Sequence, residues 1–245
     1  MSDEERETER EATRWIRREP NKRTIISKFA DPNTYPPTEH PLVTFMAGSP
    51  GAGKSEFVKS FKQSLEEITK ARPVVIDPDA VREFLPGYTG KNSYLFQRPI
   101  SIGVDDLFSF SLKHNQNIIV DGTFSDYTRA RANVVRVLNK YGVIIILYVI
   151  QSPEIAWAFT QLREVTEGRN IRKEDFISRF IGAKETVDKI KLEFKDRIRL
   201  NVIQKDYKDT KTNKQIANVF PNVKSIDECI TFRYNKSDIE RSIHA

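Results

Sequence analysis

The sequence has few residues of the kinds that build disulfides, metal centres or membrane spans. It has one cysteine, Cys229, and three scattered histidines, His40, His114 and His244, in 245 residues. One cysteine excludes an internal disulfide framework, and the histidines lack the spacing of a zinc site. No apolar run approaches the roughly 20 residues of a membrane span, and the first residues are acidic where a secretory signal is basic. We therefore expect a soluble, cytoplasmic protein without a structural metal.

Positive charge is what the composition has in excess. The net charge is +6 and the sequence pI is about 9.3, which favours anionic partners: nucleic acid, a membrane surface or small phosphorylated molecules. Many of the basic residues lie between 184 and 214, interleaved with Glu and Asp. Mixed charge of this kind is typical of a solvated helical face. Charge alone does not choose among these partners.

The order of apolar runs predicts an α/β fold. Residues 3–29, dense in Glu and Arg, predict one or two helices that dock by a narrow apolar stripe, and prolines between 31 and 37 end them. After this N-terminal appendage and linker, 1–37, we expect one domain, 38–245. Strands are expected at 42–47, 74–77, 118–121, 143–150 and 199–205, and helices at 54–70, 95–115, 126–140, 153–167, 173–196 and near 237–244. This alternation predicts a parallel sheet of about five strands with helices on both faces.

Eight consecutive residues match the P-loop pattern Gly-x-x-x-x-Gly-Lys-[Ser/Thr]. They are Gly48, Ser49, Pro50, Gly51, Ala52, Gly53, Lys54 and Ser55, and they lie where this loop works, between an expected strand and an expected helix. Its backbone N–H groups and the helix N-terminus bind phosphates, Lys54 reaches the β- and γ-phosphates, and Ser55 is a Mg²⁺ ligand. The motif predicts binding of ATP or GTP with Mg²⁺ but no particular reaction, because switches, motors and kinases share it.

Acidic residues follow two of the other expected strands. Asp77 and Asp79 end the second strand, and Asp121 ends the third. The carboxyl ends of parallel strands form the crevice where ligands bind, so an acid there is placed to accept a proton from an attacking hydroxyl. One of Asp77 and Asp79 is also expected to cap the following helix. Asp121 is interpreted as supporting the metal, with a simple strand-end cap as the alternative.

Arginines flank a glycine-containing turn after the fourth strand. Arg163 lies in the expected helix, and Arg169 and Arg172 follow Gly168. Small kinases use arginines on a mobile lid to stabilise charge on the phosphoryl group in transfer. The alternative interpretation is an ordinary surface helix.

These motifs, in this order, resemble the zeta toxin family over about residues 40–205. The resemblance implies a P-loop kinase of a bacterial toxin–antitoxin system that phosphorylates the 3′-hydroxyl of the amino sugar in UDP-N-acetylglucosamine. It also implies an antitoxin protein as partner.

The resemblance carries roles onto matching positions. Lys54 and Ser55 match the P-loop lysine and the Mg²⁺-binding hydroxyl, and Asp79 matches the catalytic base. The remaining matches are Asp121 and Thr123 at the substrate and metal site, Asp105 as a further substrate-contacting acid, and Arg163 and Arg169 as arginines that bind the γ-phosphate. The sequence departs from the family in two places: Asp121 stands where the best-known members have Glu, and Arg172 stands where Pro is frequent.

Two other functions fit the same residues. A nucleotide or polynucleotide kinase suits the basic charge and predicts labelling of a 5′-hydroxyl oligonucleotide. A nucleotide-dependent switch or interaction protein predicts nucleotide binding without a phosphorylated acceptor. No membrane partner is expected, and nucleic acid enters only as the substrate of the first alternative. The N-terminal helices are either a solvated appendage or an inhibitor in cis.

Overall fold

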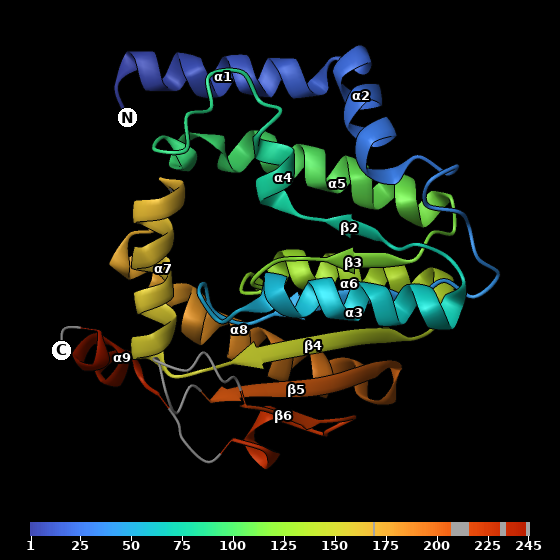
Figure 1. Cartoon of the computed structure of the whole chain (residues 1–245), viewed down its shortest axis with the longest axis vertical. Helices are drawn as coiled ribbons and strands as arrows, with labels where there is room; N and C mark the ends of the chain where they lie inside the picture. The colour runs from blue at the N-terminus through green and yellow to red at the C-terminus, as the bar shows by residue number, and fades with distance from the viewer. Residues whose placement is uncertain (169, 207–215, 231–233, 244–245) are drawn as a thin grey trace.

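A single mixed sheet forms the centre of the chain. The computed structural model describes residues 1–168, 170–206, 216–230 and 234–243. In these residues six strands form one sheet in the order β2-β3-β1-β4-β5-β6 (Figure 1). The strands are β1 (Val43–Ala47), β2 (Val74–Ile76), β3 (Ile118–Val120), β4 (Ile144–Ile150), β5 (Ile198–Asp206) and β6 (Ile216–Phe220). The first five pair in parallel and β6 is antiparallel to β5, so the α/β class and the parallel sheet are confirmed.

Helices connect the strands where apolar periodicity predicted them. They are α1 (Asp3–Arg17), α2 (Glu19–Ala30), α3 (Lys54–Thr69), α4 (Pro78–Arg82), α5 (Gln97–Lys113), α6 (Tyr127–Tyr141), α7 (Pro153–Glu167), α8 (Lys173–Phe194) and α9 (Lys236–Ser242), with short 3-10 turns at Ser93–Phe96, Lys195–Arg197 and Ile226–Glu228. Side-chain caps begin several of them: Asp77 caps α4, Asp126 caps α6 and Ser152 caps α7. Such oxygens satisfy N–H groups that the first turn leaves unpaired.

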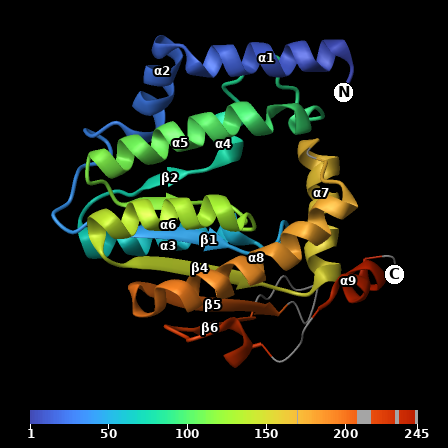
Figure 2. The same ribbon diagram turned by 180° about the vertical axis from the view of Figure 1, so that it is seen from behind.

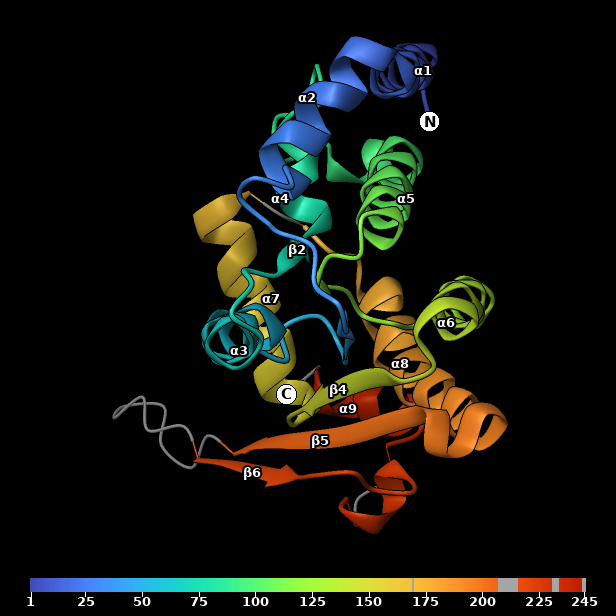
Figure 3. The same ribbon diagram turned by 90° about the vertical axis from the view of Figure 1, so that its right-hand side faces the viewer.

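The sheet is covered on both faces because side chains alternate along each strand. In β1, Val43 and Phe45 enter the larger apolar cluster with residues of α5, α6 and α8, and Met46 enters the smaller cluster with residues of α3. Figure 3 shows α3 on one side of the sheet and α5, α6 and α8 on the other. From behind, the latter three helices lie in front of the strands (Figure 2).

The N-terminal helices lie beyond the β2 edge and share the larger core (Figure 1). Ala12, Ile16, Ile25 and Ala30 are buried in the cluster that also contains residues of β1 and β3. Ile16 and Ile25 belong to the narrow apolar stripe that the sequence predicts. The division of the chain into 1–37 and 38–245 stays a prediction. The shared core joins residues from both segments.

The structure adds elements that the sequence analysis missed. The sixth strand, β6, was not expected. The helix that Asp77 or Asp79 was expected to cap is α4, and β2 and β3 end at Ile76 and Val120, one residue before Asp77 and Asp121. β6 was not predicted because it is short and follows a run of charged residues. The carboxyl ends of β2, β3, β4 and β5 lie at one edge, and α7 runs across that edge (Figure 1). β1 is parallel to its neighbours β3 and β4, so its carboxyl end lies at the same edge.

Candidate active site

The P-loop joins β1 to α3 and lies against the backbone of two other elements. Gly48 and Gly51 have φ values of +133° and +70°. A Cβ at Gly48 would overlap the carbonyl oxygen of Val149, and one at Gly51 would overlap that of Ala156. Only glycine allows this close approach to β4 and α7. The Gln151 amide also donates to the Gly51 carbonyl oxygen at 2.5 Å, so β4 and α7 set the shape of the loop.

Lys54 is buried at the centre of the site. Its ammonium donates to the carbonyl oxygens of Gly48 and Ser49, at 3.0 and 2.6 Å. The pKa of Lys54 is lowered to about 8, mainly because the ammonium is buried; the charges of Arg163 and Arg179 contribute to the lowering, and the negative charges of Asp121 and Asp79 oppose it. Lys54 therefore interacts electrostatically with groups from α4, α7, α8 and the end of β3. The predicted P-loop lysine and two predicted acids share one site.

Ser55 and Asp121 form a pair of oxygen ligands beside Lys54. The Ser55 hydroxyl donates to the Asp121 carboxylate at 2.8 Å. Burial raises the pKa of Asp121, and the Ser55 hydrogen bond and the Lys54 charge oppose that rise. Mg²⁺ binds through one or two protein oxygens together with substrate phosphates, so this pair fits it. Within the described residues no group of three or more His, Cys, Asp or Glu side chains is placed to hold a metal.

Asp79 follows β2 on the short helix α4. Asp77 accepts the Asp79 N–H at 2.8 Å and is therefore the cap of the two acids. The Asp79 side chain is about one-third exposed and pairs with the almost buried Arg82 at 2.6 Å. Arg82 holds one carboxylate oxygen of Asp79 at the rim of the site.

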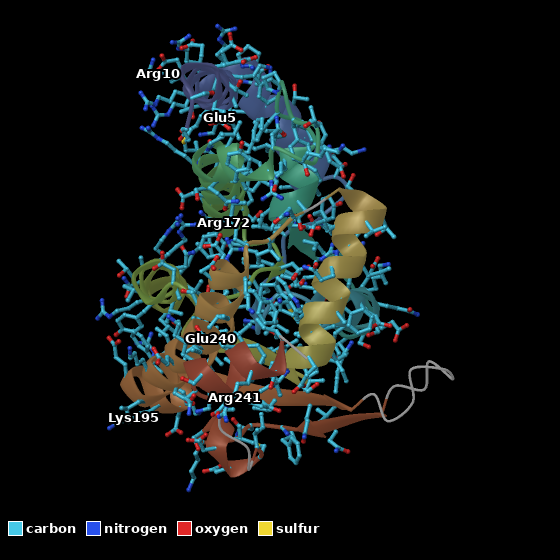
Figure 4. All side chains as sticks on the ribbon, turned by 90° about the vertical axis from the view of Figure 1, so that its left-hand side faces the viewer. Glu5, Arg10, Arg172, Lys195, Glu240 and Arg241 are labelled. Carbon is cyan, nitrogen blue, oxygen red and sulfur yellow. The ribbon has the colours of Figure 1, made fainter. Side chains whose placement is uncertain are left out.

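The arginines of the site come from α7 and α8. Arg163, on α7, affects the pKa values of both Lys54 and Asp121. Arg169 lies outside the described residues, and Arg172, at the start of α8, is exposed and pairs with Asp175 at 2.9 Å (Figure 4).

The sequence analysis missed Arg179. Burial lowers the pKa of Arg179; Asp175 and Asp79 oppose this, and Arg82 adds to it. Arg179 lies between Phe176 and Phe180, which are buried on α8. The sequence could have indicated Arg179, because an arginine between apolar residues on one face of a helix is unusual for a surface charge.

Thr123 and Asp105 occupy positions next to this centre. The Thr123 carbonyl oxygen accepts the Gly48 N–H at 3.1 Å, and its hydroxyl lies 2.8 Å from that of Ser125. Asp105, on α5, is bound by Arg136 of α6 at 2.6 Å.

Asp105 lines a cavity between α5 and α6. The cavity has a volume of about 220 Å³ and is lined by Ser101, Val104, Asp105, Phe108, Val120, Arg129 and Asn133. Val120 is the residue before Asp121, so the cavity lies on the α5 and α6 face of the sheet at the end of β3. Carboxylate, amide, guanidinium and apolar groups together suit a polar ligand that also carries an apolar surface.

Comparisons with known proteins agree on a family and a fold. A family model described as Zeta toxin matches residues 26–218. Among solved structures, the chain is similar to one from the PezAT chromosomal toxin–antitoxin system of the human pathogen Streptococcus pneumoniae, with a TM-score of 0.61 and 16% identity over 100% of this chain and 93% of that one.

A second similar structure is the AvrRxo1-ORF1:-ORF2 complex with ATP. Its TM-score is 0.54 at 11% identity, over 86% of this chain and 63% of that one. At these identities the structural likeness shows the fold alone. Comparison with curated proteins gives no match. In the part of the chain that the structure describes, every helix is too short or too polar to cross a membrane.

Proposed function

The chain belongs to the zeta toxin family, and from this premise we propose that it is a P-loop kinase whose acceptor is a UDP-activated amino sugar such as UDP-N-acetylglucosamine. ATP or GTP, bound with Mg²⁺, donates the phosphate. The observation that carries the proposal is the convergence of Asp79, Asp121 and Arg163 on Lys54. A P-loop switch needs one carboxylate for Mg²⁺, the role proposed for Asp121, whereas a kinase that transfers phosphate to a hydroxyl also needs a base, the role proposed for Asp79.

The P-loop residues would hold the nucleotide and Mg²⁺. Backbone N–H groups of 48–55 and the N-terminus of α3 face the phosphates, and Lys54 turns from its two carbonyl partners to the β- and γ-phosphates. Ser55 and Asp121 would bind Mg²⁺, which neutralises charge on the phosphates when bound. The hydrogen bond that already joins these two oxygens supports this assignment.

Asp79 is the proposed general base. It accepts the proton of the acceptor hydroxyl as that oxygen attacks the γ-phosphorus, so its carboxylate must face the P-loop across the acceptor. The ion pair with Arg82 orients the carboxylate. The cavity beside β3 is the proposed acceptor subsite, in which Asp105 accepts hydrogen bonds from sugar hydroxyls and Thr123 and Asp121 border the transferring group.

Arginines would stabilise the charge on the transferring phosphoryl group. Arg163 and Arg169 are proposed for this role from the resemblance. Arg179 joins them because it is half-buried and interacts with Lys54 and Asp79.

An antitoxin protein is the proposed partner, and the cytoplasm is the proposed location. Both rest on the family, because a cytoplasmic kinase that consumes a cell-wall precursor must be held inactive in the cell that makes it. The similar PezAT chain belongs to a toxin–antitoxin system, which supports the same proposal here.

Transfer of labelled phosphate tests the proposal. The purified chain is incubated with γ-labelled ATP or GTP, Mg²⁺ and, separately, UDP-sugars, free nucleotides and a 5′-hydroxyl oligonucleotide. We expect labelling of UDP-N-acetylglucosamine, reduced about 100-fold or more in Asp79→Asn. Asp106→Asn is the matched control, since Asp106 pairs with Lys22 on the far side of α5, and it should keep full activity. Labelling of the oligonucleotide alone would favour a polynucleotide kinase, and nucleotide binding with no labelled acceptor would favour a switch.

A further inference from the structure

A buried lysine outside the P-loop lies directly against it. Lys205 is near the carboxyl end of β5, and its side chain is 3% exposed. Its ammonium donates to the Gly53 carbonyl oxygen at 3.1 Å and pairs with the Glu56 carboxylate at 3.0 Å. A Cβ at Gly53 would overlap this ammonium, so the charge lies against the backbone of the loop.

Packing does not explain a charge at this place. Lys205 leaves the same face of the sheet as Ile203, which is buried in the apolar cluster with Val58 and Leu65 of α3. Removing an ammonium from water is costly unless partners compensate it. One of the two partners is a backbone carbonyl of the P-loop itself, so the buried ammonium holds part of the loop backbone in place.

The orientation of the Gly53 carbonyl sets the direction of the Lys54 N–H. A trans peptide is planar, and its C=O and N–H point in opposite directions. Holding the Gly53 oxygen toward Lys205 therefore turns the Lys54 N–H away from Lys205. The same carbonyl accepts the Phe57 N–H at 3.3 Å, so α3 and Lys205 fix this peptide together.

We infer that Lys205 is a positioning residue of the phosphate cradle, which orients the Gly53–Lys54 peptide and adds positive charge behind the phosphates of a bound nucleoside triphosphate. The inference rests on the proposed nucleotide site and extends it to β5. Lys205 should affect binding of the phosphate donor and leave binding of the acceptor unchanged, because Lys205 lies on the α3 side of the sheet and the acceptor cavity lies on the α5 and α6 side.

Lys191 provides a matched control. It is also a buried lysine that donates to two backbone carbonyl oxygens, those of Lys195 and Ile198, at 3.1 and 2.7 Å. These carbonyls lie at the amino end of β5, the opposite end from the P-loop. Lys205→Met and Lys191→Met therefore each remove a buried ammonium that donates to the backbone, beside the P-loop in the first case and near the amino end of β5 in the second.

The dissociation constant of ATP with Mg²⁺ tests the inference. By calorimetry, Lys205→Met should raise it about tenfold, because the Gly53–Lys54 peptide is then no longer held in the binding orientation and one positive charge near the phosphates is lost. The KM for the acceptor should not change. Lys191→Met should be destabilised in urea and bind ATP like the wild type. Glu56→Gln, which keeps the bond from Lys205 to Gly53, should not bind ATP more weakly.

Each outcome separates the inference from the proposed function. If the wild type binds ATP and Lys205→Met binds it equally well, Lys205 has only a structural role and the inference is wrong. If the wild type binds no nucleotide, the proposed function fails first. Should Lys205→Met not fold, Lys205→Gln retains a donor without the charge and should raise the dissociation constant about threefold; an unchanged value would overturn the inference.

Discussion

Nucleotide affinity should depend on pH through Lys54. Burial lowers the pKa of Lys54 to about 8 in the nucleotide-free protein. Phosphates placed beside it stabilise the ammonium form and raise that pKa again. Nucleotide binding is therefore expected to draw a proton from solution wherever free Lys54 is neutral.

The expected magnitudes follow from the pKa of about 8. About one-tenth of the free protein carries neutral Lys54 at pH 7, about half at pH 8 and about nine-tenths at pH 9. Proton uptake on binding should follow these fractions, and the dissociation constant should rise about tenfold between pH 7 and pH 9. A terminal phosphate, with a second pKa of about 6, is already ionised in this range.

Stability without nucleotide should change in the opposite direction. Because the pKa of Lys54 is lower in the folded than in the unfolded protein, the unfolded chain binds more protons between the two values, and the free energy of unfolding rises with pH. Relative to Lys54→Met, the wild type should gain about 1.4 kcal/mol between pH 7 and pH 9.

Calorimetry of ADP binding in buffers of different ionisation enthalpy measures the proton uptake. Urea unfolding of wild type and Lys54→Met at both pH values measures the stability term. Tight binding at pH 8 without proton uptake, together with a constant stability difference between the two proteins, would refute the burial argument.

Three further outcomes are expected. Gly51→Ala should destabilise the fold by about 2 kcal/mol or more in a urea titration and abolish nucleotide binding, because its Cβ meets the main chain of α7. Gly142→Ala is the control: Gly142 has a φ of +80° and open space around it, so this variant should show only the smaller cost of the backbone conformation. Ile16→Ala should cost about 2–5 kcal/mol of unfolding free energy, so that loss of α1 unfolds the protein instead of activating it, whereas Ile68→Ala, at a side chain 77% exposed, should cost little. Arg179→Gln should lower kcat more than it changes the dissociation constant of ATP; an unaltered kcat would remove Arg179 from the site.

The parts of the site that lie together in the sequence were predictable from it. The P-loop is eight consecutive residues, and its turn and helix start follow from local backbone preferences. The acids of α4 and β3 were found because strand ends are marked by apolar runs, although only the structure shows which of Asp77 and Asp79 is the cap. The helices and the parallel sheet followed from periodicity for the same reason.

What the sequence determined by itself is therefore the α/β order, the P-loop motif and two neighbouring carboxylates, because each depends on residues close in the chain. Tertiary structure alone decided that the charge of Arg179 on α8 affects Lys54, that Lys205 of β5 supports Gly53, and that α1 and α2 share the core. Lys205 and Gly53 are 152 positions apart, and nothing in the local pattern of charge distinguishes a lysine on the surface from one buried under a P-loop. Burial makes the difference, since it turns an ordinary lysine into a charge that must have a partner.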